Sequence, residues 1–316
     1  VKVFSALTSH QRAVLQALFV TFLWSTSWVL IKLGLMDIPA LTFAGLRYML
    51  AFLVLLPFVA RGDHIGDLRR LSRRGWGLLI ALGVLLYAVT QGAQFMGLSL
   101  LPAVTVSLIY NMTPILVALL AMPTLGEIPT RQQWLGMAIF IVGALVYFYP
   151  IALPEGQLTG VLIVAIGVCA GAGGTILGRS ANRSAQVSPL AVTTVSMGVG
   201  AVLMLGAGAI TQGIPPLSPI NILVITWLAV VNTAFAFTLF NRTLRTLSAM
   251  ESSLINNTMM VQIAILAWIF LGEDLDGRQI AGLVLAAVGV LIVQLRRRAP
   301  AFAAPSAAVI PPAARR

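Results

Sequence analysis

The chain has 316 residues, of which 59% are hydrophobic and 9% are charged, and its mean hydropathy is +0.97. Soluble domains carry about 25% charged residues, so this composition excludes an ordinary soluble protein and indicates an integral membrane protein. The formal net charge is +11, a value that by itself fits either nucleic-acid binding or an asymmetric membrane topology.

Apolar segments of about 20 residues, the length that crosses a bilayer as a helix, recur along the chain. The single Cys169 lies inside one of them, so neither a disulfide framework nor a thiol metal site is expected. The predicted transmembrane helices are 13–34, 40–60, 76–97, 102–122, 132–149, 158–178, 189–211, 219–240, 249–271 and 279–295.

The second half of the chain repeats the first at an offset of 146 residues. Of the 53 positions from Phe95 to Tyr147, 18 are identical to the residue found 146 positions later, without a gap. Each half holds an odd number of predicted helices, so the second half enters the membrane from the opposite face. We therefore expect an all-α integral membrane protein with ten transmembrane helices, built as two inverted-topology repeats at 13–149 and 158–295, with a flexible cytoplasmic tail at 299–316.

Basic residues gather on one side of this predicted topology. Seventeen of the 20 Lys and Arg residues lie on the side that holds both termini, and Lys32, Arg47 and Arg278 are the exceptions. Because cytoplasmic loops of membrane proteins are rich in Lys and Arg, both termini are predicted to be cytoplasmic, in a multi-pass protein of the inner cell membrane. The positive charge is then explained by the orientation of the protein in the lipid bilayer, and nucleic acid is not an expected partner.

The first predicted helix carries Trp24, Trp28 and Lys32 on one face, because the three residues are spaced by four. This face is either an aromatic wall with a cation at its mouth or a packing surface whose lysine extends to the outer headgroups.

Arg47 lies about 12 Å into the second predicted helix at 1.5 Å per residue. A membrane-embedded arginine either binds a substrate or forms a structural ion pair. We favour the ion pair, and the candidate partners on the outer side are Glu273, Asp274 and Asp276.

Polar side chains recur in the middle of several predicted helices, where contact with lipid would be costly. They either line a substrate cavity between the halves or only join helix to helix. Asn111 and Asn257 are equivalent in the two repeats, which favours a position near the pseudo-two-fold axis. The predicted substrate-binding residues are Trp24, Trp28, Tyr87, Gln91, Tyr110, Asn111, Asn232, Asn256 and Asn257. Aromatic rings and amides together suit a small polar or amphiphilic ligand, and the scarcity of charge disfavours a strongly anionic one.

Two features mark interruptions and starts of helices. Pro114 cannot donate a backbone hydrogen bond, so it frees the Tyr110 carbonyl in the fourth predicted helix, whereas Met260 occupies the equivalent position in the ninth. Capping boxes are predicted at the starts of the fifth and tenth helices, formed by Thr130 with Gln133 and by Asp276 with Gln279.

Three glutamates lie beside predicted helix starts, where the helix dipole stabilises negative charge. The alternative for them is a gating or proton-carrying role. Together with the two intramembrane cations, these glutamates are predicted to have structural or gating roles. The five charged residues are Lys32, Arg47, Glu127, Glu251 and Glu273.

Catalytic and metal-binding patterns are not found. His10 and His64 lie outside the predicted helices, no HExxH motif or nucleophile elbow occurs, and no predicted helix pairs two carboxylates. The sequence therefore predicts a protein that is not an enzyme, with no catalytic residues, no metal and no cofactor.

The motif Leu125-Gly126-Glu127 recurs as Leu271-Gly272-Glu273, and each copy precedes a Gly-rich helix. This arrangement resembles the drug/metabolite transporter superfamily over residues 13–295. The pattern from Trp24-Ser25 to Lys32-x-Gly34-Leu35, with Phe43-x-x-x-Arg47, is similar to its EamA branch. One departure is Met260, where the family often has a proline.

The resemblance implies a secondary transporter of small metabolites such as amino acids, which works by alternating access and is often coupled to protons. Our interpretation is an exporter. A passive facilitator or importer is the alternative within the class, and a non-transporting membrane scaffold or sensor is the alternative outside it. A sensor would carry an appended soluble domain, and the longest predicted loop, 61–75, is too short for one.

Overall fold

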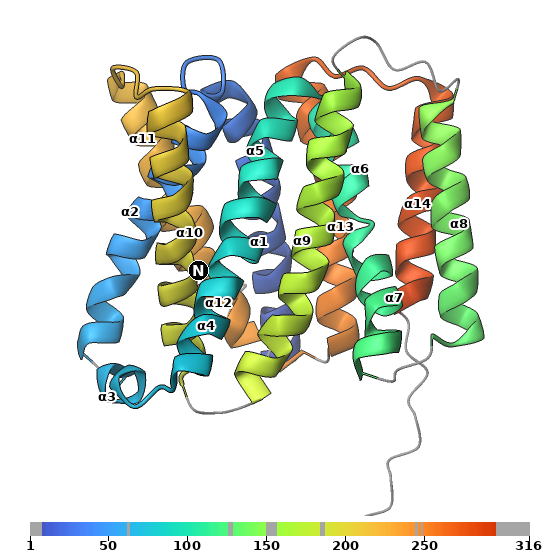
Figure 1. Ribbon diagram of the computed structural model, residues 1–316. Helices are drawn as coiled ribbons and strands as arrows, with labels where there is room; N and C mark the ends of the chain where they lie inside the picture. Colours follow the sequence, from blue (N-terminus) through green and yellow to red (C-terminus); the bar gives the residue numbers. More distant parts are fainter. Residues whose placement is uncertain are drawn as a thin grey trace, which may run out of the picture.

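The computed structural model describes residues 8–61, 64–125, 129–149, 157–183, 187–243, 246–247 and 249–294. Within these ranges all regular secondary structure is helical, as predicted (Figure 1). Glu127 and the predicted tail at 299–316 lie outside the described residues.

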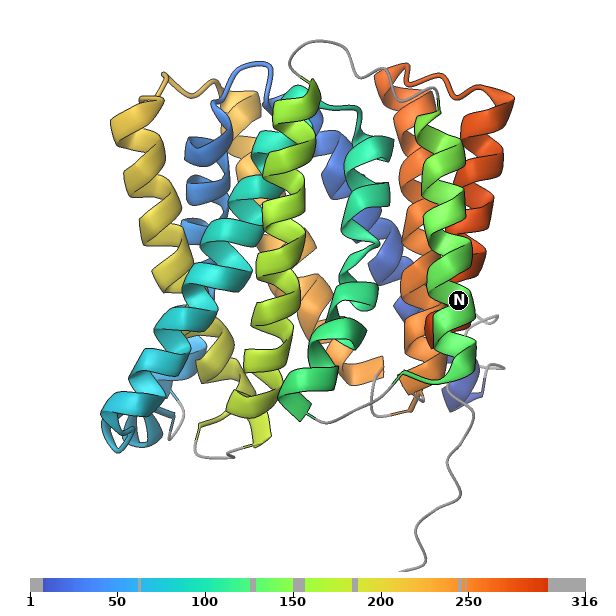
Figure 2. The ribbon, with the colours of Figure 1, turned by 45° about the vertical axis from the view of Figure 1, so that its right-hand side comes forward.

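The helices run between two opposite faces of the molecule (Figures 1 and 2). Their bounds agree with the predicted segments to within a few residues, and the short α3 was not predicted. They are α1 (Ser9–Gly34), α2 (Ala40–Arg61), α3 (His64–Arg69), α4 (Arg73–Leu82), η1 (Gly83–Val89), α5 (Thr90–Leu100), α6 (Ala103–Tyr110), α7 (Thr113–Leu125), α8 (Arg131–Phe148), α9 (Gln157–Arg183), α10 (Pro189–Thr211), α11 (Pro219–Ala229), η2 (Val230–Phe235), α12 (Ala236–Thr243), α13 (Ala249–Leu271) and α14 (Gly277–Gln294).

The apolar helices are long enough for a membrane protein. Among the described residues, seven helical stretches are long and apolar enough to cross a bilayer, and three apolar stretches are shorter, at Pro219–Phe235, Ile255–Leu271 and Gly277–Val293. Large apolar side chains such as Phe58 and Phe270 are exposed on the outside of the bundle. In water such a surface would be unfavourable, but in a bilayer it contacts lipid. The chain is a multi-pass membrane protein.

Helices distant in the sequence pair closely. α2 packs against α10, α1 against α13, and α8 against α14, the last pair lying side by side at the right of Figure 1. At the α8–α14 contact, a Cβ atom added to Gly136 would lie 2.7 Å from the carbonyl oxygen of Gly289, and one added to Gly143 would lie 2.7 Å from that of Gly282. Only glycine permits this backbone approach, which is typical of tightly packed membrane helices.

The predicted interruption of the fourth transmembrane segment is confirmed. α6 ends at Tyr110, and α7 begins at Thr113, one residue before Pro114. The Thr113 hydroxyl donates a hydrogen bond of 2.7 Å to the freed Tyr110 carbonyl oxygen, so the side chain satisfies what the proline leaves open. The equivalent α13, with Met260 in place of the proline, is continuous.

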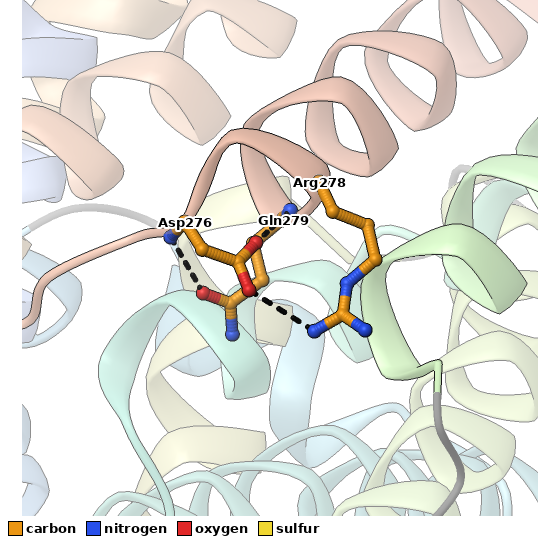
Figure 3. Close-up of polar contacts among 3 residues, drawn as sticks. All are labelled: Asp276, Arg278 and Gln279. Atoms are coloured by element: carbon orange, nitrogen blue, oxygen red, sulfur yellow. Dashed lines mark hydrogen bonds and ion pairs between the residues drawn. The ribbon is translucent and has the colours of Figure 1, made fainter.

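Both predicted capping boxes are also confirmed. Gln133 N–H donates to Thr130 Oγ1 at 3.2 Å, and Thr130 N–H donates to Gln133 Oε1 at 2.8 Å. At the start of α14, Gln279 N–H donates to Asp276 Oδ1 at 2.7 Å, and Asp276 N–H donates to Gln279 Oε1 at 2.9 Å (Figure 3). These boxes satisfy backbone donors that a helix start leaves unpaired.

Candidate functional site

The first group of predicted site residues joins α1 to the segment η2. Trp24 donates its indole N–H to the carbonyl oxygen of Asn232 at 3.0 Å, and its ring lies 5.1 Å from the rings of Phe237 and Phe240. Asn232 is fully buried and donates its amide N–H to the Leu23 carbonyl oxygen. Its Oδ1 has no hydrogen-bond partner within the described structure. A hydrogen bond and two ring contacts thus fix the position of Trp24, and Asn232 Oδ1 remains without a hydrogen-bond donor.

The second group lies between α1, α5 and α6. Trp28, which is 8% exposed, meets the Tyr110 ring edge-on at a centroid distance of 6.1 Å. The Tyr110 hydroxyl donates to the Thr90 carbonyl oxygen at 2.5 Å. The Thr90 hydroxyl lies 2.6 Å from the Leu85 carbonyl oxygen and 3.2 Å from that of Gly167. The structure therefore brings Trp28 and Tyr110 together, and Tyr110 is oriented by a directed hydrogen bond.

The third group surrounds Arg47 on α2. Its guanidinium carbon lies 5.2 Å from the centre of the Tyr48 ring and 6.0 Å from that of Phe95. The Tyr48 ring in turn meets the Tyr87 ring at 5.8 Å. Tyr48 and Phe95 were missed in the sequence, because the signal for Tyr48 is only its position next to Arg47 and Phe95 resembles any apolar residue.

Arg47 does not form the predicted ion pair. Its Nη2 lies 3.5 Å from Thr233 Oγ1, and its Nε is buried without a hydrogen-bond partner. Among the described residues, no Asp or Glu forms a salt bridge with it. The preference for Glu273, Asp274 or Asp276 was wrong, because Glu273 is engaged elsewhere and Asp276 pairs with Arg278 at 3.0 Å.

This environment leaves the charge of Arg47 incompletely compensated. The side chain is 6% exposed, and cation–π contacts contribute only about 0.5–2 kcal/mol each. Leaving a buried charge without its partner costs about 3–5 kcal/mol. The two aromatic rings thus stabilise Arg47 in part, and a directed acceptor for Nε is missing from the described residues.

Two π-helical segments lie at equivalent positions of the two halves. η1 covers Gly83–Val89 and contains Tyr87, and η2 covers Val230–Phe235 and contains Asn232 and Thr233. The 146-residue offset of the internal repeat carries 83–89 onto 229–235. Insertions of this kind interrupt the regular ladder of helix hydrogen bonds and are frequent at functional sites. Arg47 contacts η2 directly and η1 through the Tyr48 ring.

The remaining predicted site residues differ in their surroundings. Asn111 donates its side-chain amide to the Ser107 carbonyl oxygen of its own helix at 2.8 Å. Gln91 and Asn257 are half-buried, whereas Asn256 is exposed. The structure therefore places Trp28 and Tyr110 between α1, α5 and α6, and Arg47 and Asn232 beside η2. It ties Asn111 to its own backbone.

Lys32 and Glu273 stabilise the turn between α5 and α6. Lys32 Nζ donates to the carbonyl oxygens of Leu98 and Leu101, both at 2.6 Å. Glu273 accepts hydrogen bonds from the N–H groups of Ala103 at 2.6 Å and Val104 at 3.1 Å. A cation thus meets the carbonyl end of one helix and an anion meets the amide end of the next, as the helix dipoles favour.

These contacts correct two predictions. Lys32 does not stand free at a cavity mouth, because two hydrogen bonds hold it to backbone carbonyls of the α5–α6 turn. Glu273 does stabilise a helix start, but that helix is α6 and not the adjacent α14. Gly272 makes this possible, because its φ of 65° turns the chain at the end of α13, a conformation that only glycine adopts freely.

At the opposite face, Glu251 lies in the first turn of α13, as predicted. Its Oε1 lies 2.7 Å from His10 Nε2 at the start of α1. The contact joins the starts of two helices that also pack along their lengths.

The exposed start of α14 carries a charge pair outside the bundle (Figure 3). The Gln279 backbone N–H, with a smaller contribution from Arg278, holds the pKa of the Asp276 carboxyl below its ordinary value. The charge of Asp276 thus stabilises the start of α14. In the contacts described, Asp276, Arg278 and Gln279 do not touch the three groups of predicted site residues.

A polar network that joins α13 to α1 was not predicted from the sequence. Gln262 on α13 accepts a hydrogen bond from the Ser25 hydroxyl at 2.9 Å and donates to Thr21 Oγ1 at 3.3 Å and Thr258 Oγ1 at 3.0 Å. The spacing of Thr258 and Gln262 by four on one helix face was the available signal. Among the described residues no cluster of His, Cys, Asp or Glu is suited to a metal ion.

Comparison with known proteins identifies the family. The model of the EamA-like transporter family matches residues 11–149 and again residues 158–295. The S-adenosylmethionine/S-adenosylhomocysteine transporter of Chlamydia trachomatis serovar L2 is 26% identical over 292 residues, 87% of this chain and 85% of that protein. A protein of Salmonella typhimurium named "Probable amino-acid metabolite efflux pump" is 28% identical over 290 residues, 87% and 92% of the two chains.

A protein of known structure shares this fold. A solved crystal structure superposes with a TM-score of 0.64 at 18% identity, over 90% of this chain and 98% of the other. At this identity the likeness concerns the fold alone. The family match covers most of the chain in two successive copies, and the relatives are named as transporters and not as enzymes. The chain belongs to the EamA-like transporter family.

Proposed function

We propose that this protein is a secondary transporter that exports small polar or amphiphilic metabolites of the amino-acid type by alternating access. The observation that carries the proposal is that polar and aromatic side chains of the first half contact η2 of the second half and also reach η1, at equivalent π-helical segments. The contacts are Trp24 with Asn232, Arg47 with Thr233 and Tyr48 with Tyr87. The names of the relatives support the substrate class, since one refers to amino-acid metabolites and the other to S-adenosylmethionine, which contains a methionine moiety. The name of the Salmonella relative supports the outward direction.

The pairing of helices supports two inverted five-helix repeats. Under the 146-residue offset, α2 corresponds to the region of α10 and α8 to that of α14, and each of these helices packs against its counterpart. Two halves related by a two-fold axis in the membrane plane would form such pairs, with a substrate site near the midplane. On the topology argument from Lys and Arg, both termini are cytoplasmic.

The proposed site consists of Trp28, Tyr87, Tyr110 and Asn232, with Trp24, Gln91, Asn111, Asn256 and Asn257 as the further predicted members. The second candidate, a passive facilitator, differs in coupling. A proton-coupled carrier accumulates substrate against its gradient when a pH difference is imposed, whereas a facilitator only equilibrates it.

The test is transport by purified protein in proteoliposomes. Counterflow is measured with labelled L-amino acids and S-adenosylmethionine, with and without an imposed pH gradient. We expect counterflow of at least one of these compounds, and we expect Tyr87→Ala and Asn257→Leu to fold and to raise the apparent substrate constant or abolish transport. Exposed Asp274→Ala is the matched control and should transport normally. If both site variants transport like wild type at equal protein levels, the proposed site is wrong, and if no compound shows counterflow, the substrate class is wrong.

A further inference from the structure

Arg47 combines deep burial with an unfilled hydrogen-bonding capacity. It is 6% exposed on α2, its Nε has no partner, and its one described hydrogen bond, from Nη2 to Thr233 Oγ1, is long at 3.5 Å. A guanidinium has five N–H donors and stays charged inside proteins. Within the described helices, Arg47 is therefore a cation prepared for an acceptor that the chain does not supply.

The neighbours of Arg47 stabilise its charge without satisfying its donors. Tyr48 and Phe95 offer ring faces at 5.2 and 6.0 Å, and a ring face is not a directed acceptor for Nε. The nearby Thr233 hydroxyl donates its own proton to the Leu228 carbonyl oxygen at 2.9 Å. Such an arrangement holds the guanidinium in place while leaving its buried Nε without a hydrogen-bond acceptor.

We propose that Arg47 binds the carboxylate of the transported molecule, so that the substrate is a monocarboxylate and Arg47 selects for it. The geometry of the fork suits a planar carboxylate, which accepts two parallel N–H bonds. This inference rests on the proposed function and specifies which chemical group of the substrate the site recognises.

The other membrane cation explains why a single negative charge is expected. Lys32 Nζ donates two of its three N–H groups to backbone carbonyl oxygens of the α5–α6 turn, so it is held at that turn. One buried guanidinium matches one carboxylate. Among the described residues no Lys or Arg other than Arg47 is buried, so a phosphate dianion would lack a second buried cation.

The location of Arg47 connects this selection to both halves. Its contact with Thr233 places it against η2, and its neighbour Tyr48 touches Tyr87 of η1. A carboxylate bound to Nε would therefore lie beside the two π-helical segments, and such segments are frequent at functional sites.

The test compares acids with their uncharged amides. Purified protein in detergent is titrated with L-leucine, L-methionine and L-phenylalanine and with their carboxamides, and apparent dissociation constants are obtained from thermal shift. In wild type we expect at least one acid to bind about 10- to 100-fold more tightly than its amide, the factor for one charge-assisted hydrogen bond. Arg47→Gln should bring this ratio close to one by weakening the acid only.

Two further variants control for folding and charge. Arg47→Lys keeps the positive charge but loses the planar fork, so it should fold and give an intermediate ratio even where Arg47→Gln fails to fold. Arg278→Gln removes one exposed positive charge, engaged with Asp276, and should leave the ratio unchanged. Equal binding of acid and amide by wild type, an unchanged ratio in Arg47→Lys and Arg47→Gln, or stabilisation by chloride and not by any acid would overturn the proposal.

Counterflow with the same compounds separates this proposal from the transport function. Transport of acids and amides at equal rates, unaffected by Arg47→Lys, would leave the transporter intact and refute the carboxylate contact. Arg47-dependent binding of an acid without any counterflow would retain the contact and refute the transport function.

Discussion

The turn between α5 and α6 offers the sharpest test of how the structure is stabilised. Glu273 lies 170 residues away in the sequence from Ala103, yet its carboxylate accepts hydrogen bonds from the first two backbone N–H groups of α6, at 2.6 and 3.1 Å. Glu273→Ala would leave both donors unpaired at a helix start. It would also remove the negative charge that the dipole of α6 favours.

The expected loss follows from these two bonds. Each backbone donor left unsatisfied costs about 1–3 kcal/mol, so two donors cost about 2–6 kcal/mol. Because the site is partly exposed and water can satisfy part of the loss, we take the lower half of this range. Glu273→Ala should therefore lower the free energy of unfolding by about 2–4 kcal/mol. Glu273→Gln keeps one acceptor oxygen and should lose about half as much.

The assay is equilibrium unfolding of the purified protein in mixed detergent micelles. The control is Asp274→Ala, since Asp274 is adjacent and exposed, and it should change stability by no more than about 0.5 kcal/mol. If Glu273→Ala unfolds like this control, Glu273 does not cap α6 in the membrane protein. If instead Glu273→Gln is fully stable but transport loses its pH dependence, the alternative proton-carrying role is the better explanation.

Two further predictions concern packing and pH. Gly289→Ala should destabilise the α8–α14 contact, because its Cβ would lie 2.7 Å from the Gly136 carbonyl oxygen. The control Gly206→Ala meets open space and should be neutral or slightly stabilising. Thermal unfolding of both variants measures the difference, and equal stability would contradict the close backbone contact. The pKa of Asp276 is lowered in the folded protein from an ordinary value of 3.8, so its stabilisation is present above that pH and is lost as pH falls through the folded pKa. Asp276→Asn keeps the cap without the charge, so wild type should lose stability relative to Asp276→Asn only below about pH 4, and parallel pH profiles would disprove the contribution.

Features encoded within a few residues could be read from the sequence. The capping boxes at Thr130 and Asp276 depend on spacing by three residues, and both are formed. The interruption at Pro114 follows from the missing N–H of proline, and α6 ends just before it. The membrane class follows from composition, because runs of apolar residues of this length have no favourable place in water.

The partners of the intramembrane charges could not be read in this way. Lys32 finds carbonyl groups 66 and 69 residues away, and its spacing with the tryptophans pointed instead to an aromatic face. Many pairings of opposite charge are compatible with one sequence, and only the packing of helices selects among them. The predicted pairing of Arg47 with an outer acid failed for this reason.

The sequence by itself therefore determined the membrane class, the approximate helix bounds, the internal duplication and the helix starts, because these depend on composition and short spacing. Only the tertiary structure decided which residues meet: Glu273 with α6, Trp28 with Tyr110, and Arg47 with Tyr48 and Thr233. The physical reason is that a buried polar group must be satisfied by whatever lies beside it in space, and neighbours in space are set by the packing of whole helices.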